Sequence, residues 1–344
     1  MAPVAIEVET VGREARAPEQ APSDARWEAL AGLRMEEAED PRARGVARLM
    51  PGARDEGVRV GLFDRLRNRA IPRRWEQSPG GAIWRLQPTV GGVLVGEARA
   101  VQERRLSLFA IQPDSGDLLW GGLEFDEPWW IALETTIGDV ALLHRYPRPD
   151  RPETCGCIAV DALEGRILWE DRTGRAIFGD GSTLLLQRGD PTDWSDAAIV
   201  DVRTGEPLRA IQDRLDEVLD YQEACGDQKR WQGWVGMEEI PGGAGGWEEL
   251  LGRLGVPPRN VTIVGSLERA TYGPWSAVVV HTTAERGASG ITSILYLLRD
   301  DKVFLRQELH AGSPGPSGDS FFIWNGVLMA VRNGTSLLGI DLRN

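Results

Sequence analysis

Lysine is nearly absent from this sequence. Lys229 and Lys302 are the only two among 344 residues, and arginine supplies the rest of the positive charge. Acidic residues outnumber basic ones by 52 to 39, which gives a formal net charge of −13. Because non-specific nucleic-acid binding needs a basic face that displaces counterions, this balance argues against a nucleic-acid partner. High acidity with little lysine is typical of a salt-rich cytoplasm, and a GC-rich bacterial genome would also favour arginine.

Cysteine is also scarce. The three cysteines, Cys155, Cys157 and Cys225, are too few and odd in number for a disulfide scaffold in a chain of this length. The first thirty residues carry acidic side chains and no apolar run that fits a signal-peptide core or a membrane span. We therefore expect a cytoplasmic protein with no membrane partner, and we expect a monomer.

Recognisable catalytic motifs are missing as well. There is no Walker loop, no strand-to-helix glycine fingerprint and no nucleophile elbow. His281 and His310 have no acidic or cysteine neighbour in the sequence that suggests a triad. Cys155 and Cys157 share a soft-metal spacing, but neither Cys225 nor His144 completes a ligand set. The sequence thus predicts no catalytic residue and no metal ligand.

The N-terminal part has a different composition from the rest. From Met1 to about Gly57 it is rich in Ala, Glu, Arg and Pro. Ser23 and Asp24 can cap a short helix that carries Trp27 and neighbouring leucines at helical spacing. We expect a flexible, partly helical extension at residues 1–70 and a β domain at residues 71–344.

An internal repeat predicts the fold of this β domain. Residues 110–120 align with residues 159–169, and both copies end in Gly-x-x-Leu-Trp. A third copy at 199–208 keeps Asp201 and Gly205 but lacks the tryptophan. The motif fits a hairpin in which a strand ends near the Asp and the Gly supplies positive φ in the turn. The spacing between copies is about the length of one four-stranded propeller blade.

The two ends of the domain are predicted to meet in one blade. Short apolar runs separated by turn residues continue from Ala82 onward, which indicates an antiparallel meander. The last copy, Leu337–Leu342, stops before its outer strand. Arg74–Gln77 has the sequence that ends the second copy, so we expect it to supply that strand and to remove an exposed sheet edge.

Residues 212–258 interrupt the β pattern. Leu215, Val218 and Leu219 have helical spacing, and Trp247–Leu254 is predicted to form a second short helix. Removing this helical insertion leaves room for about five blades of roughly 45 residues each. The predicted fold is all-β: a β-propeller of about five four-stranded blades, with an N-terminal strand closing the last blade.

The repeated hairpins resemble those of pyrroloquinoline-quinone-type (PQQ-like) propellers. The span from Ala82 to about Ile211 is similar to a bacterial family, domain of unknown function 4905, through the stretches at 83–86, 129–130 and 143–152. This resemblance implies a propeller fold and supplies no activity. The quinone dehydrogenases use a longer ring, a calcium site and vicinal cysteines, whereas Gly156 separates Cys155 from Cys157. We therefore expect no cofactor.

Five residues are candidates for ligand binding: Trp129, Trp130, His144, Arg145 and Tyr146. The last three lie where a strand runs into a proline-rich loop, and together they have the chemistry to hold an anion or a carbohydrate. The alternative interpretation, which we favour, is that these side chains form hydrogen bonds that anchor the loop. The indole pair either stacks on a ligand or packs in the core.

Two functions follow from these observations. The first is a non-catalytic scaffold that docks an unknown protein partner, with Trp231, Trp234 and Trp247 of the insertion as anchors. The alternative is a small-ligand binder or enzyme that uses the central channel for a sugar or an organic acid. A channel lined by convergent polar residues would favour the alternative, and an apolar outer patch would favour docking.

Overall fold

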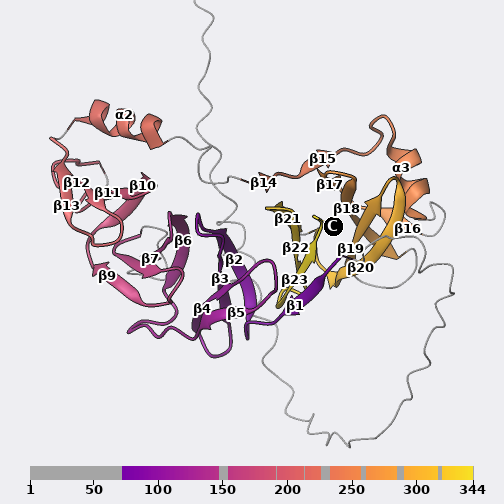
Figure 1. The fold of residues 1–344 in the computed structure, drawn as a ribbon, viewed down its shortest axis with the longest axis horizontal. Coiled ribbons are helices and arrows are strands. Elements are labelled where there is room, and N and C mark those ends of the chain that lie inside the picture. Colours follow the sequence, from indigo (N-terminus) through magenta and orange to yellow (C-terminus); the bar gives the residue numbers. More distant parts are fainter. Residues whose placement is uncertain are drawn as a thin grey trace, which may run out of the picture. The chain divides into compact units, whose positions relative to one another are not determined.

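The structure, a computed structural model, is described for most of the predicted β domain. The described residues are 72–146, 154–190, 192–212, 214–225, 233–256, 261–284, 290–316 and 320–343. The expected N-terminal extension with its short helix lies outside them, and so does Trp231. Strands dominate the described residues and form five antiparallel sheets, which we number 1 to 5 (Figure 1).

Sheets 1 to 3 repeat one simple topology. In each of them four strands pair with their neighbours in chain order. This confirms the meander that the turn-separated apolar runs predicted. Sheet 1 consists of β2 (Ala82–Pro88), β3 (Leu94–Ala100), β4 (Arg105–Ile111) and β5 (Leu118–Gly121), sheet 2 of β6 (Ile131–Ile137), β7 (Val140–Arg145), β8 (Cys157–Asp161) and β9 (Ile167–Asp171), and sheet 3 of β10 (Arg175–Asp180), β11 (Thr183–Gln187), β12 (Ala197–Asp201) and β13 (Pro207–Ala210).

Sheets 4 and 5 extend the same meander with extra short strands. Sheet 4 has the order β15-β17-β18-β19-β20, with β16 also paired to β18, and sheet 5 has the order β1-β23-β22-β21-β14. Sheet 4 is formed by β15 (Glu238–Ile240), β16 (Val261–Ile263), β17 (Leu267–Tyr272), β18 (Trp275–Ala284), β19 (Ile291–Arg299) and β20 (Lys302–Ser313), and sheet 5 by β1 (Arg74–Gln77), β14 (Trp234–Val235), β21 (Phe321–Trp324), β22 (Val327–Arg332) and β23 (Ser336–Asp341).

The predicted meeting of the two ends of the domain is confirmed. Strand β1 pairs antiparallel with β23, with Trp75 opposite Gly339. The amide of Asp341 donates to the carbonyl of Arg73 at 2.9 Å. In sheet 2 the amide of Asp161 makes the same bond to Arg166, the residue after the turn glycine. The N-terminal strand therefore takes the place of the missing outer strand and begins with the same hydrogen bond.

A tryptophan–glycine contact joins consecutive sheets. The Trp120 indole of sheet 1 donates to the Ala162 carbonyl of sheet 2 at 2.8 Å, and its ring lies against Gly165. A Cβ atom added to Gly165 would lie 2.5 Å from that ring, and the φ of Gly165 is +70°. Both the turn and the contact thus require glycine. Trp169 makes the equivalent bond to Val202 in sheet 3, at 2.9 Å.

Trp75 makes this contact for the last sheet. Its indole donates to the Pro113 carbonyl at 2.8 Å, and its ring lies against the turn glycine Gly116 of sheet 1. The third repeat copy has Arg209 at the tryptophan position, opposite Ile199. Sheet 3 consequently lacks the indole that would join it to a following sheet.

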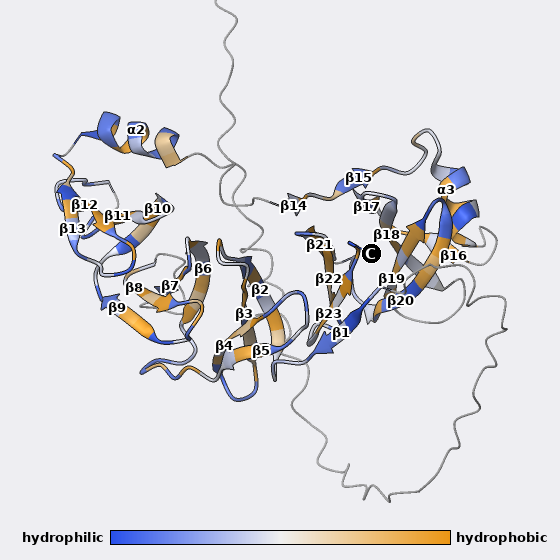
Figure 2. Cartoon of the chain, viewed as in Figure 1, coloured by the Kyte–Doolittle hydropathy of each residue, from blue (hydrophilic) through white to orange (hydrophobic). Residues whose placement is uncertain are grey.

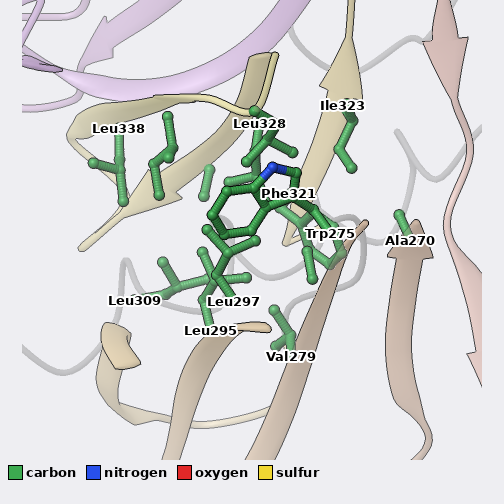
Figure 3. Packing of buried hydrophobic residues seen from close by; sticks show 14 residues of the cluster. Ala270, Trp275, Val279, Leu295, Leu297, Leu309, Phe321, Ile323, Leu328 and Leu338 are labelled. Carbon is green, nitrogen blue, oxygen red and sulfur yellow. The ribbon is translucent and has the colours of Figure 1, made fainter. Parts of the chain in front are cut away.

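Buried apolar side chains fill the spaces between neighbouring sheets. Separate clusters join sheets 1 and 2, sheets 2 and 3, sheets 5 and 1, and sheets 4 and 5. Figure 3 shows the last of these, in which Phe321 and Leu328 of sheet 5 pack against Trp275 and Leu297 of sheet 4. The hydropathy colours show hydrophobic and hydrophilic stretches side by side on the strands, as sheets with one buried and one accessible side require (Figure 2).

Two helices form where the sequence predicted them. Helix α2 (Leu215–Cys225) packs Val218 and Tyr221 against sheet 3, where Phe178 stacks on Tyr221 at a centroid distance of 5.7 Å. Helix α3 (Trp247–Leu254) covers one face of sheet 4. Both sheet faces are apolar, and within the described residues no neighbouring sheet packs on them. The helices bury these faces in place of a sheet.

The prediction that residues 212–258 stay out of the sheets is wrong for two short strands. β14 pairs with β21 through Trp234 and Val235, and β15 pairs with β17. Strands of two or three residues have no detectable alternation, and they form because a sheet edge offers unpaired backbone groups. The described fold is all-β and propeller-like, with repeated four-stranded antiparallel meanders. None of the helices in the described ranges has the length and apolarity needed to cross a membrane.

Candidate functional site

The first strands of sheets 1 to 3 share a β-bulge at the same place. The residues left unpaired are Trp84 in β2, Glu134 in β6 and Ile177 in β10. A bulge re-aims the side chain it carries. The Glu134 side chain is 42% exposed and Ile177 is 37% exposed, although both lie inside strands and directly follow the buried residues Leu133 and Ala176. The bulges therefore present these side chains on the accessible side of the first strands.

Arg85 connects β2 to β6 across the boundary between sheets 1 and 2. Its NH1 group donates to the Leu133 carbonyl at 2.8 Å and to both the carbonyl and the carboxylate of Glu134 at 3.0 Å. The neighbouring Gln87 donates to the Glu134 carbonyl at 3.5 Å. Within the described residues, Nε and NH2 of Arg85 donate to no protein acceptor. The guanidinium thus keeps hydrogen-bonding capacity for another molecule.

His144 approaches the same carboxylate from β7, and Tyr146 follows directly after that strand. The Nδ1 atom of His144 lies 3.7 Å from Glu134 Oε2, and the His144 side chain is 10% exposed. Burial lowers the pKa of His144, against an opposing effect of Glu134, and burial raises the pKa of Tyr146. We call Trp84, Arg85, Gln87, Glu134, His144 and Tyr146 the β2–β6 cluster.

Arg145 does not join this cluster. Because successive residues of a strand point to opposite faces, it lies on the other side of β7 from His144. There its guanidinium donates to Asp126 and Glu170, each at 2.9 Å. The Arg145 guanidinium holds the pKa of Asp126 below its ordinary value. The expected grouping of His144, Arg145 and Tyr146 is therefore divided between two faces.

A buried ion pair supports the cluster from behind. Arg99 Nε donates to Glu97 Oε1 at 2.5 Å, and both side chains are almost fully buried in β3. Arg99 also donates to the carbonyls of Trp129 and Ile131, and Glu97 accepts from the Leu133 amide at 2.7 Å. The pair thereby fixes β6 on sheet 1.

The two tryptophans proposed as ligand residues have different environments. Trp129 is 6% exposed, and the Arg99 guanidinium lies 5.2 Å from its ring centroid and 5.7 Å from that of Trp84. Trp130 is half-buried and meets Trp129 edge to face, at 6.5 Å between centroids. Packing accounts for Trp129, whereas Trp130 and Trp84 are only half-buried and keep accessible area.

The three residues proposed as partner anchors are placed as follows. Trp234 stacks on Phe322 within sheet 5, with centroids 4.5 Å apart. Trp247 begins α3 and packs against the core of sheet 4. Trp231 lies outside the described residues. The two described indoles thus contribute to packing of the fold, which a reading of 212–258 as a loose excursion did not anticipate.

Sequence reasoning missed Arg85, Gln87, Glu134 and the bulge at Trp84. Arg85 lies in the stretch 83–86 that resembles the family, which was the one available signal. A bulge cannot be recognised in a sequence when its partner strand is unknown. The exposure of Glu134 therefore could not be predicted. The sequence also offered no acidic neighbour for His281, whereas the fold places Glu268 at 3.7 Å and Ser293 at 2.8 Å from its ring nitrogens. Ser293 is fully buried, which keeps a substrate from that network.

Acid should destabilise the chain through His144. Because burial lowers the pKa of His144 below its ordinary value of 6.5, the unfolded chain takes up this proton at higher pH than the folded chain. The free energy of unfolding is then highest above pH 6.5 and falls as the pH drops towards the folded-state pKa. His144→Gln removes this titration, so its Tm should decrease less than that of the wild type between about pH 7.5 and about pH 5.5.

His310→Gln is the matched comparison for this experiment, because burial and the nearby His281 also lower the pKa of His310. His310→Gln should also reduce the decrease in Tm on acidification, and its effect should be independent of the effect of His144→Gln. Equal Tm losses in the wild type and in both variants would contradict the assignment.

The chemistry available to the β2–β6 cluster is hydrogen bonding. It contains a guanidinium with unused donors, a half-exposed carboxylate and indole surfaces. Among the described side chains, no three of His, Cys, Asp or Glu lie close enough together to bind a metal ion. A small pocket of about 180 Å³ lies elsewhere, between sheets 5 and 1, and the Arg343–Asp114 ion pair at 3.0 Å lies at its wall.

Comparison with known proteins gives limited similarity. Residues 89–169, which include Glu134, His144 and Tyr146, match a family described as a domain of unknown function (DUF4905), in agreement with the resemblance of the sequence. No curated protein matches the sequence. The solved Dos1 propeller is 9% identical over 76% of this chain and 67% of its own, with a TM-score of 0.26.

A second solved structure is MPT-1, a GDP-Man-dependent mannosyltransferase from Leishmania mexicana. It is 12% identical over 81% of this chain and 90% of its own, with a TM-score of 0.21. Neither likeness to a solved structure is strong enough to carry an argument. What the comparisons support is a similarity of the central part of this chain to a family of unknown function.

Proposed function

We propose that this chain is a β-propeller of five PQQ-like blades, in which sheets 1 to 5 are the blades and β1 completes the last. The support is the contact between an indole and the turn of the next sheet, which recurs at Trp75, Trp120 and Trp169. In sheets 1 to 3 the first strand is then the innermost one. In this arrangement the β2–β6 cluster lies on the inner edge of its two blades.

We further propose that the protein is a non-catalytic binding module and that this cluster holds a small polar ligand. The observation that carries the proposal is Arg85. The Arg85 side chain is 27% exposed, and three hydrogen bonds from NH1 hold its guanidinium, so its orientation is fixed while Nε and NH2 remain available. Fixed donors beside accessible aromatic surface are characteristic of small-molecule sites.

Ligand-observed NMR with a mixture of neutral sugars, polyols and organic acids tests this proposal. We expect saturation transfer from the protein to at least one compound, and loss of that signal in Arg85→Met. Glu249→Gln on α3 is the matched control, because it changes an exposed carboxylate that also pairs with an arginine, Arg253, at 2.7 Å. Absence of transfer to every compound, or an unchanged signal in Arg85→Met, would rule out the site.

Protein docking is a second candidate, favoured by exposed leucines around sheet 3. Leu208 on β13 is 60% exposed, and Leu215 and Leu219 on one side of α2 are 57% and 54% exposed. Arg209 lies 3.9 Å from Glu217, which brings β13 next to α2. Apolar residues grouped at a surface mark interaction sites. A partner that is recovered with the wild type but not with a Leu215→Ser, Leu219→Ser variant would support docking, and equal recovery would refute it.

A further inference from the structure

We propose that the ligand of the β2–β6 cluster is a neutral polyhydroxylated molecule, a sugar or a polyol, and not an organic acid. This inference rests on the proposed function, because it names the class of ligand for the same site. Three features of the cluster support it: its charge balance, the hydrogen-bonding groups that it leaves unsatisfied, and its aromatic surface.

The charges of the cluster cancel in pairs. Arg85 is paired with Glu134 at 3.0 Å, and Arg99 behind it is paired with Glu97 at 2.5 Å. Burial disfavours the charged form of His144, so the imidazole adds no positive charge near neutral pH. An incoming carboxylate would meet the Glu134 carboxylate beside every donor that Arg85 offers. Like charges in contact are strongly unfavourable at a partly buried site, whereas a neutral ligand meets no such repulsion.

The cluster leaves both hydrogen-bond donors and a hydrogen-bond acceptor unsatisfied. Arg85 offers donors at Nε and NH2, and Gln87 Oε1 is a buried acceptor with no partner among the described residues. A buried acceptor without a donor costs about 1–3 kcal/mol. A carboxylate has only acceptors, so it would satisfy Arg85 and leave Gln87 Oε1 unpaired. A hydroxyl group both donates and accepts, and neighbouring hydroxyls on one ring can serve both residues.

Aromatic surface lies next to these groups. Trp84 precedes Arg85 at the bulge, and Trp130 follows Trp129 just before β6 begins. Both indoles are half-buried, and the Arg99 guanidinium lies 5.7 Å from the Trp84 ring centroid. Indole rings combine an apolar face with a polar edge, which suits a ligand whose C–H face is apolar and whose rim is hydroxylated. The site thus contains the charged, amide and aromatic side chains that the binding of a sugar requires.

Binding of paired compounds to the full-length chain tests the class of ligand. Each pair consists of a neutral sugar or polyol and the corresponding acid. The pairs are glucose with glucuronate, galactose with galacturonate, and sorbitol with gluconate, and the readout is saturation-transfer NMR with dissociation constants from titration. We expect at least one neutral member to bind, and its acid partner to bind about tenfold more weakly or worse, which corresponds to about 1.4 kcal/mol. Equal or tighter binding of the acid would overturn the inference while the proposed function stands. Failure of all six compounds would overturn both.

Two variants separate the charge argument from the hydrogen-bond argument. Glu134→Gln leaves Arg85 without its carboxylate, so the preference should shift towards the acid of each pair. Gln87→Leu removes the buried acceptor and leaves the ion pair in place, so binding of the neutral member should weaken while binding of its acid partner stays unchanged. Glu249→Gln should change neither result. An unaltered preference in Glu134→Gln, with the fold confirmed by circular dichroism, would refute the charge argument.

Discussion

Replacing Trp75 with alanine is expected to lower the free energy of unfolding by about 3 kcal/mol, the usual cost of removing a packed tryptophan or phenylalanine. The variant loses the indole bond to Pro113 and the ring contacts with Gly116 and Gly339. It also weakens the pairing of β1 with β23, through which the two ends of the domain are joined. Chemical denaturation monitored by circular dichroism measures the change.

Arg74→Ala is the matched control for Trp75→Ala. Arg74 lies in the same strand and is exposed, and among the described residues its side chain donates to Gln307 at 2.6 Å. Its loss should cost less than about 0.5 kcal/mol, as is usual for a surface residue. Trp75→Phe keeps most of the ring contact and should cost about 1 kcal/mol from the lost hydrogen bond. If Trp75→Ala and Arg74→Ala unfold at the same denaturant concentration, the indole does not hold the sheets together.

Arg99→Met should produce an effect of similar or larger size, about 3–5 kcal/mol, because it leaves a buried charge without its partner. Glu97 is fully buried and would retain only the Leu133 amide as a hydrogen-bond donor. The variant also removes the bonds to the carbonyls of Trp129 and Ile131. Burial already raises the pKa of Glu97, so the cost should be smaller in acid, where the carboxyl is protonated.

A double-mutant cycle isolates the interaction between Arg99 and Glu97. The double variant Glu97→Gln, Arg99→Met should be more stable than the sum of the two single changes predicts, because no unpaired charge remains. The exposed Glu249–Arg253 pair on α3 is the control, and its coupling energy should be about 0.5 kcal/mol. Additive single changes at Glu97 and Arg99 would contradict a buried, mutually dependent pair.

Much of the strand order was predictable because the repeat is local in sequence. Gly116 and Gly165 mark turns that need positive φ, and the residues on either side form strands wherever the copies align. The same comparison identified Arg74–Gln77 as an outer strand. Helices α2 and α3 were predictable for the same reason, since the spacing of Leu215, Val218 and Leu219 is a property of one segment.

The candidate site was predictable only in part. His144 and Tyr146 were found from the sequence, and the fold does bring His144 within 3.7 Å of Glu134. Arg85 and Glu134 are 49 residues apart, and nothing in either segment shows that they pair. The division of Arg145 from His144 depends on the face to which each strand residue points, which the packing of β7 between β6 and β8 fixes.

The sequence by itself determined the repeated hairpins, the strand that completes the last sheet and the position of both helices. Each of these depends on turn chemistry and periodicity within a few residues. Only the tertiary structure decided that β14 and β15 join sheets, that Arg99 and Glu97 are buried together, and that bulges present Trp84 and Glu134. These outcomes depend on which surfaces meet, because burial, desolvation and edge pairing are properties of contacts between segments far apart in the chain.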